Sequence, residues 1–347
     1  MEFLPTTLGT RPRLAIEISA EGVVAARAED AAALLAAVSR GKLAAGAVAP
    51  GLKVGNIADR AAVVTAVKAA LDGVAGRGGD RSRDVTVVVP DAAARVLLLD
   101  FDSLPSKAAE ALPVVRFRLK KLLPFDADDA ALSYQIMSSA KSGVQVLAVA
   151  MPREVLAEYE GVVTAAGYLP GAVLPSTLAA LAGLDESDSA ALVVNAGLGQ
   201  LTAAIVKGGV LLLHRTIDIS ADPVAPALVA AAAAAHGEYG YHEAALESAE
   251  IAHVAAARAE VSIVGHEVTQ AVSVAAAYFE DTLSSAPQVL LAAGSVGAET
   301  LQRMLAESGL EGLRVKELVE SAMMDAGAVS ASVPRGWLAG VRGALKG

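Results

Sequence analysis

The chain has 347 residues, of which 54% are apolar and only 3% aromatic, and its mean hydropathy is +0.50. This is enough apolar surface for a large core, and the length suggests two domains. The formal net charge of −10 argues against a nucleic-acid-binding surface, which needs a basic face, and the lack of cysteine excludes disulfides and thiolate zinc sites.

The chain start and the longest apolar runs predict a soluble cytoplasmic protein. The opening MEFLPTTLGTRPR lacks the apolar core of a signal peptide. No stretch reaches the 18 or so apolar residues that a spanning helix needs.

The first quarter of the chain reads as strands and helices in alternation. LAIEISAEGVVAARA (14–28) predicts a β-hairpin with Glu21 and Gly22 at its turn. A helical stretch is expected from about Asp30, and a second one over 59–74. After the turn-rich break 76–84, VTVVVPD (85–91) reads as a buried strand.

The middle of the chain, from residue 95 onward, contains a further set of predicted strands and helices. RVLLLDF (95–101) predicts a strand, and a helix is expected from a Ser106 cap to about Leu123, kinked at Pro113. ALSYQIM and VQVLAVAMP predict two further strands, followed by a helix that ends at Gly167. A strand and a helix (GAVLPSTLAALAGL) then lead to the acidic linker DESDSA.

The second half opens on ALVVNAGLGQLTAAIVKGGVLLLHRTI (191–217), which reads as a strand, a tight glycine loop and a second strand. An alanine-rich helical region is expected over 222–283, then the strand QVLLAAG (288–294), a helix over 298–308 and a short helix around Trp337. Alternating strands and helices predict an α/β protein.

The two hairpins can be superposed as an internal repeat. IEISAEG (16–22) matches VNAGLGQ (194–200) in hydrophobic pattern, with a polar residue at the second place and a small one at the fourth. Two similar halves that offer hairpin loops to one cleft are the arrangement of actin, sugar kinases and heat-shock chaperone ATPases.

Such a cleft predicts a set of nucleotide-contacting residues. Backbone N–H groups of glycine loops hold phosphates, carboxylates hold Mg²⁺, and a glycine turn lies beside adenosine; LLAAGSVGAETL (290–301) is a turn of that kind. The candidates are Glu17, Ser19, Gly22, Asn195, Gly197, Gly199, Thr202, Gly294, Ser295 and Gly297.

These residues, and the middle unit above all, resemble the PilM family of type IV pilus assembly proteins, which is related to FtsA. The resemblance covers about residues 12 to 343, and its most specific part includes VTVVVPD, RFRLKKLLPFDADDAALSYQIM and VLAVAMPREVLAEYEGVVTAAG. It implies an actin-like two-lobe α/β fold in which each lobe is a mixed sheet with flanking helices. The first lobe would span 12–184 plus 328–347, with an FtsA/PilM-type insertion at about 92–168, and the second would span 190–327.

Membership would imply an adaptor. Proteins similar to PilM bind the N-terminal cytoplasmic tail of a PilN-type membrane partner in a groove between the first lobe and the inserted subdomain. The resemblance therefore implies pilus inner-membrane platform proteins as partners and a cytoplasmic location, peripheral to the inner membrane through the partner. It also implies ATP in the cleft, with Mg²⁺ only if ATP is bound, and it leaves a homo-oligomer open.

The nucleotide loops depart from the family pattern. The first loop, Asp-x-Gly followed by Lys in the family, here has Glu17, Ser19 and Val24. The second loop begins with Asn195 in place of Asp, and a neutral amide attracts a divalent ion weakly. Together these changes predict a degenerate cleft without efficient Mg-ATP hydrolysis, hence no catalytic residue, whereas nucleotide binding without turnover stays open.

Other interpretations compete with a pilus adaptor. An active actin-like ATPase and a GspL-like component of a type II secretion platform are the two alternatives. The residues Arg116, Arg118, Lys120 and Lys121 could contact an acidic partner or anionic lipid, but a solvated helix C-terminus is the preferred interpretation. The segment around Trp337 is expected to close the first lobe, with a membrane-surface helix as the alternative.

The five histidines show no ligand spacing, so no metal site is expected.

Overall fold

The computed structural model describes residues 11–75, 83–141, 143–185, 187–219, 265–307, 310, 312–325, 328 and 333–346. Most of the predicted alanine-rich helical region, from 220 to 264, lies outside this set, and residues 265–283 of it form a helix. Nearly all of the predicted break at 76–84 also lies outside the described residues.

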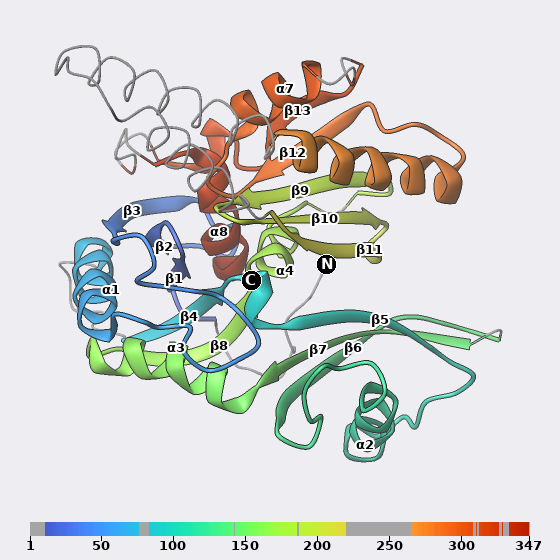
Figure 1. Cartoon of the computed structure of the whole chain (residues 1–347), viewed down its shortest axis with the longest axis horizontal. Helices are drawn as coiled ribbons and strands as arrows, with labels where there is room; N and C mark the ends of the chain where they lie inside the picture. Colours follow the sequence, from blue (N-terminus) through green and yellow to red (C-terminus); the bar gives the residue numbers. More distant parts are fainter. Residues whose placement is uncertain are drawn as a thin grey trace, which may run out of the picture.

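Two five-stranded sheets form the two lobes (Figure 1). The first has the order β3-β2-β1-β4-β8, and the second has the order β11-β10-β9-β12-β13. The first is built from β1 (Leu14–Ser19), β2 (Gly22–Ala28), β3 (Leu35–Lys42), β4 (Asp84–Val89) and β8 (Leu169–Pro175). The second is built from β9 (Ala191–Gly197), β10 (Gln200–Lys207), β11 (Val210–Asp218), β12 (Val289–Ala293) and β13 (Arg314–Glu317).

The two sheets repeat each other strand by strand. In both, the first three strands in chain order are antiparallel. The fourth strand pairs in parallel with the opening strand, and the fifth pairs in parallel with the fourth. Glu17 faces Val24 across its hairpin, as Asn195 faces Thr202 across the second. The hairpin superposition made from the sequence is therefore correct in register.

An inserted unit lies between β4 and β8. Its three-stranded sheet has the order β5-β7-β6, formed by β5 (Arg95–Phe101), β6 (Ala130–Ala140) and β7 (Gly143–Pro152). The helix α2 (Ala108–Leu119) covers this sheet and closes a small core around Val115, Leu119 and Val146. The next helix, α3 (Arg153–Ala165), buries Val155 and Tyr159 in the core of the first lobe, beside α1 (Arg60–Val74).

Two short helices are buried between the large sheets. Every residue of α4 (Ser176–Ala182) and of α8 (Ala339–Leu345) is buried, and the two helices pack together in a core shared by both lobes (Figure 1). The segment around Trp337, in η3 (Arg335–Leu338), joins this core, and Trp337 is only 2% exposed. The segment therefore packs inside the protein, in the core shared by the lobes, and its assignment to the first lobe stays a prediction. Within the described residues, no helix combines the length and apolar character that crossing a membrane requires.

The remaining short elements lie at the ends of strands. They are η1 (Asp91–Ala93), η2 (Ser321–Met323) and α7 (Ala298–Ala306). η1 follows β4 and α7 follows β12, and these are corresponding strands of the two sheets.

Several local predictions were wrong. The stretch after Asp30, expected to be helical, contains β3, because its alanine-rich sequence fits either structure and pairing with β2 decides. The 191–217 stretch contains three strands rather than two, since Gly208 and Gly209 both adopt positive φ and turn the chain again. The helix α2 begins after Lys107 and has no Ser106 cap.

Candidate functional site: a cleft between the lobes

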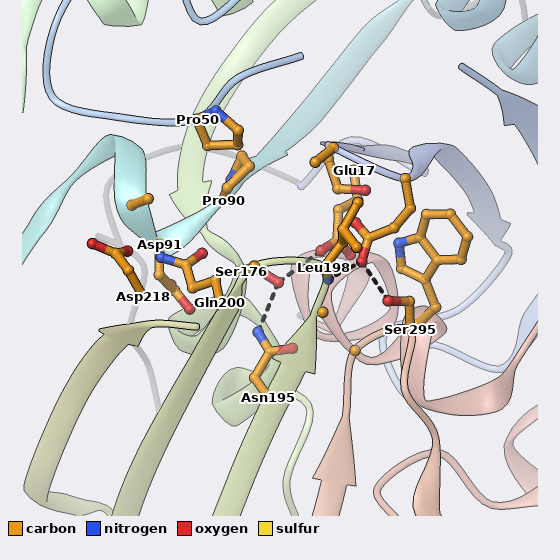
Figure 2. A pocket seen from close by; sticks show the side chains of 18 residues that line it. Glu17, Pro50, Pro90, Asp91, Ser176, Asn195, Leu198, Gln200, Asp218 and Ser295 are labelled. Atoms are coloured by element: carbon orange, nitrogen blue, oxygen red, sulfur yellow. Dashed lines mark hydrogen bonds between the residues drawn. The ribbon is translucent and has the colours of Figure 1, made fainter. Parts of the chain in front are cut away.

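Three turns from both lobes enclose a cavity of about 210 Å³ (Figure 2). They are the turns β1–β2, β9–β10 and β12–α7, which the sequence predicted as nucleotide loops. The cavity is lined by Glu17, Ser19, Ala20, Glu21, Pro50, Pro90, Asp91, Ala92, Ser176, Asn195, Gly197, Leu198, Gly199, Gln200, Asp218, Gly294, Ser295 and Trp337.

Most of the predicted site residues line this cavity. They are Glu17, Ser19, Asn195, Gly197, Gly199, Gly294 and Ser295. Gly22 lies outside it and allows close strand pairing, because a Cβ there would meet the carbonyl oxygen of Gly41. Thr202 is buried in β10, with its hydroxyl 3.0 Å from that of Thr216, and Gly297 precedes α7 with φ +77°.

Asn195 joins the lobes through two hydroxyl groups, of which Figure 2 shows that of Ser176. Its Nδ2 donates to Ser176 Oγ and to Thr177 Oγ1, each at 3.0 Å. The Ser176 hydroxyl in turn donates to Glu17 Oε1 at 2.7 Å, and the Thr177 hydroxyl donates to Asp91 Oδ2. Each hydroxyl thus donates to one carboxyl group and accepts from the amide, so both protons of the amide nitrogen are used.

Glu17 is uncharged at neutral pH in this environment. Its side chain is 6% exposed, and burial raises its pKa from 4.5 to about 8, against the opposing effect of the Ser176 hydrogen bond. Nearby Asp91 and Glu21 raise this pKa further. A protonated carboxyl group is a poor ligand for Mg²⁺, which binds through anionic oxygens.

A half-buried histidine, His214, lies within the electrostatic influence of Asp91. Burial lowers the pKa of His214, while the negative charge of Asp91 acts in the opposite direction. His214 lies on β11, and its Nε2 is buried with no hydrogen-bond partner. The lowered pKa favours the neutral imidazole.

Glu21 crosses the cleft from the first lobe to the second. Its Oε1 accepts hydrogen bonds from the backbone N–H of Leu198 and from the Ser295 hydroxyl, the latter at 2.5 Å. One partner lies in the β9–β10 turn and the other in the β12–α7 turn. A carboxylate of the chain itself is therefore the group held by these turns.

The residues of the cleft do not fit a bound Mg-ATP. The cavity of about 210 Å³ is smaller than the roughly 300–1,000 Å³ of pockets that bury a ligand of that size. Within the described residues, no group of three or more histidine or acidic side chains converges as metal ligands would. Asn195 is neutral, and burial disfavours the ionised form of Glu17, so the two positions expected to face the metal supply little negative charge.

A second, wider cavity of about 760 Å³ adjoins the cleft. It is a groove between the loop 49–55 of the first lobe, the start of the inserted unit and β11 of the second lobe. Its lining residues are Ala49, Pro50, Gly51, Leu52, Lys53, Val54, Gly55, Ala92, Ala94, Arg95, Val96, His214, Arg215, Thr216 and Asp218. Lys53, Arg95 and Arg215 give this groove, as a whole, an excess of positive charge over Asp218.

The loop wall of the groove is held in one shape by Asn56 and Glu158. The buried Asn56 accepts from Gly51 N at 2.8 Å and from the Tyr159 hydroxyl at 3.2 Å, and donates to Lys53 O at 2.6 Å. The Glu158 carboxylate accepts from the backbone N–H groups of Gly55 and Asn56. A loop fixed in this way needs little ordering when a ligand binds.

The basic cluster at the end of α2 is partly used inside its own unit. Arg116 donates to the carbonyl oxygen of Ala130 at 3.3 Å, and Lys120 pairs with Asp128 at 2.5 Å. Arg118 and Lys121 are exposed. This division favours the solvated-end interpretation for half of the cluster.

Sequence reasoning missed several residues of the cleft. Glu21 was placed at a turn, without a partner, and Ser176 and Thr177 were read only as part of a helix. Asp91 ends the strand VTVVVPD, and a carboxylate directly after a buried strand was the available signal. The contacts of Glu21 connect residues 177 and 274 positions apart, which no local pattern reveals.

Solved structures share this architecture. A chain described as "PilM-PilN type IV pilus biogenesis complex" aligns with a TM-score of 0.71 and 20% identity, over 96% of this chain and 98% of that one. EutJ from Carboxydothermus hydrogenoformans aligns with a TM-score of 0.45, 12% identity and coverages of 96% and 89%. The cytoplasmic domain of EpsL, an inner-membrane component of the type II secretion system of Vibrio cholerae, gives 0.37, 16%, 65% and 78%.

The first of these similarities shows the fold, and the other two are too weak to carry an argument. The predicted actin-like two-lobe α/β fold is confirmed. No protein-family model and no curated protein matches the sequence.

Proposed function

We propose that this chain is a cytoplasmic adaptor of a type IV pilus inner-membrane platform that binds the N-terminal tail of a PilN-type membrane protein. The observation that carries the proposal is the match, over 96% of the chain, to a structure described as a PilM-PilN complex. The middle unit, on which the sequence resemblance to PilM rests, forms the inserted subdomain. The protein would then lie at the inner membrane through its partner.

The groove of about 760 Å³ is the binding site that we assign to the tail. It lies where the first lobe meets the inserted subdomain, as the resemblance implies. Its rigid loop wall and apolar residues such as Leu52, Val54 and Val96 suit an extended peptide that inserts a few side chains. The proposal includes no ATP hydrolysis, because Asn195 is neutral and burial disfavours a charge on Glu17, at the two positions expected to face the metal.

Blocking the groove tests this assignment. Gly51 lines it, has ordinary backbone angles, and an added Cβ would meet no atom within 4 Å. Gly51→Trp should therefore fold normally and fill the groove, weakening the affinity for a labelled PilN-type tail peptide at least about tenfold. Fluorescence anisotropy measures this affinity.

Gly312→Trp is the matched control. Gly312 also has open space around its Cβ position and lies outside the groove, so its variant should bind the peptide as the unaltered chain does. Equal affinities of the two variants would show that the tail binds elsewhere. Failure of the unaltered chain to bind any PilN-type tail at micromolar concentration would remove the adaptor proposal.

A further inference from the structure

Glu21 connects the three turns that the sequence predicts to hold a nucleotide. It belongs to the β1–β2 turn and contacts the β9–β10 and β12–α7 turns. Glu21 lies between β1 and β2, and its Oε1 receives the Leu198 N–H and the Ser295 O–H. A backbone N–H in a glycine turn and an adjacent hydroxyl are donors that bind an anionic oxygen. The second lobe thus presents an anion site, and the first lobe provides the anion.

The glycine of the second turn is shaped around this oxygen atom. A Cβ added at Gly197 would lie 2.9 Å from Glu21 Oε1 and 3.5 Å from Ser295 Oγ. In a phosphate-binding loop, glycine is needed for the same reason, since the backbone must approach an oxygen closely. Here the oxygen that approaches belongs to Glu21.

A second carboxylate, that of Glu317, is held at the start of α7, just after the β12–α7 turn. Glu317 Oε1 accepts from Ala298 N, at the start of α7, with a distance of 2.9 Å. Its Oε2 lies 2.9 Å from the position of a Cβ on Gly336, in the η3 segment. The donors of the adenosine-type turn are therefore also directed at a side chain of the protein.

We infer that Glu21 is a built-in anion that takes the place of a phosphate group and holds the two lobes closed without nucleotide. This inference goes beyond the proposed adaptor function and does not depend on the partner. Glu17 and Asn195 replace the aspartates of the family pattern, yet the cleft is still formed. The inference explains this, because Glu21 provides the closure that a nucleotide would otherwise provide. The groove beside the cleft then keeps one shape regardless of the nucleotide supply.

The distance between the lobes tests the inference. The chain has no cysteine, so spin labels can be placed on Ala69→Cys in α1 and Ala306→Cys in α7, both exposed positions without polar side-chain contacts. Without nucleotide, pulsed dipolar EPR should give one narrow distance distribution, unchanged by millimolar Mg-ATP. Glu21→Ala should broaden the distribution and shift it to longer distance.

Glu280→Ala controls for the loss of one negative charge. Glu280 is exposed in the helix of residues 265–283, away from the cleft, and its variant should match the unaltered protein. An unchanged distribution in Glu21→Ala, or a broad distribution in the unaltered protein that Mg-ATP narrows, would overturn the inference.

A second variant keeps the test independent of folding. Glu21→Gln preserves the size of the side chain and removes its charge, so the hydrogen bond from Leu198 should weaken. Hydrogen exchange of the Leu198 amide should then become about tenfold faster, while amides in the β1 and β2 ladder keep their rates. Equal exchange of Leu198 in both proteins would contradict the role assigned to the carboxylate.

Discussion

Asn195 is best understood as part of a completed hydrogen-bond network. Two hydroxyls, on Ser176 and Thr177, each donate to a carboxyl group and accept from the amide. An aspartate at this position would face hydroxyl oxygens whose protons are already donated to Glu17 and Asp91. The amide therefore suits the two carboxyl groups, which explains why asparagine stands where an acidic metal ligand is expected.

Glu17 makes the stability of the protein depend on pH. Its pKa is raised from 4.5 to about 8 mainly by burial, so below pH 4.5 it is protonated in both the folded and unfolded chain. Between pH 4.5 and 8 the folded chain keeps a proton that the unfolded chain releases. This group alone then lowers the free energy of unfolding by about 1.4 kcal/mol for each pH unit of rise.

Glu17→Gln should remove that contribution. The amide has the shape of the protonated carboxyl and cannot ionise, so the variant should lose stability less steeply than the unaltered protein between pH 5 and 8. Urea unfolding at several pH values measures both slopes, with Glu280→Gln as the exposed control. A variant slope equal to the unaltered one would show that Glu17 is ionised in the folded protein.

At the scale of elements, the closest contact lies between the buried helices α4 and α8. A Cβ on Gly343 would meet the carbonyl oxygen of Ala179 and lie 2.7 Å from the Gly183 nitrogen, both backbone atoms. Arg342 strengthens the same contact by donating to Gly183 O at 2.7 Å. These helices carry the Ser176 and Thr177 hydroxyls and close the core shared by the lobes.

Gly343→Ala should therefore destabilise the protein. Backbone atoms cannot rotate away as a flexible side chain can, so forcing the helices apart should cost about 1–3 kcal/mol of unfolding free energy. Chemical denaturation measures it. Gly51→Ala, with no atom within 4 Å of the added Cβ, should change stability by less than about 0.5 kcal/mol. Equal stabilities of the two variants would mean that α4 and α8 are not packed at this distance.

Local sequence patterns predicted the elements whose periodicity is strong and failed where it is weak. The hairpin 14–28, the helix α1 and the strand β4 were predicted because turn residues, a helical pattern from Asp59 to Val74 and a run of valines mark them. The strand β3 was missed because alanine is tolerated in both helix and strand, and only pairing with β2 selects between them.

At the scale of the whole molecule, the internal repeat was the most informative sequence feature. It predicted two matching sheets and a cleft formed by their turns, because the topology of each half determines where its loops lie. The content of that cleft could not be predicted in the same way. Whether a turn holds a phosphate or a distant carboxylate depends on which side chain the opposite lobe presents, and this is a tertiary property.

The cleft and the groove should differ in how their ligands affect the thermal stability of the chain. A ligand that binds only the folded chain raises the unfolding midpoint, by about 2.7 kcal/mol of stability at a hundredfold excess over its Kd. We expect a PilN-type tail peptide to raise Tm, because the groove with its fixed loop is open to it. Mg-ATP should leave Tm unchanged, because the cleft of about 210 Å³ is bridged by Glu21, whose carboxylate already occupies the Leu198 and Ser295 donors.

Differential scanning fluorimetry with each ligand measures the two shifts, and Gly51→Trp should abolish the peptide shift while Gly312→Trp keeps it. A rise of Tm with Mg-ATP in the unaltered protein would show that nucleotide enters the cleft despite Glu21. Such a rise would argue for the ATP-binding alternative, since binding energy would then have displaced the carboxylate from the Leu198 and Ser295 donors. If only the peptide raises Tm, the partner tail, and not nucleotide, is the ligand that stabilises the folded chain. The shape of the groove is then set by the chain itself.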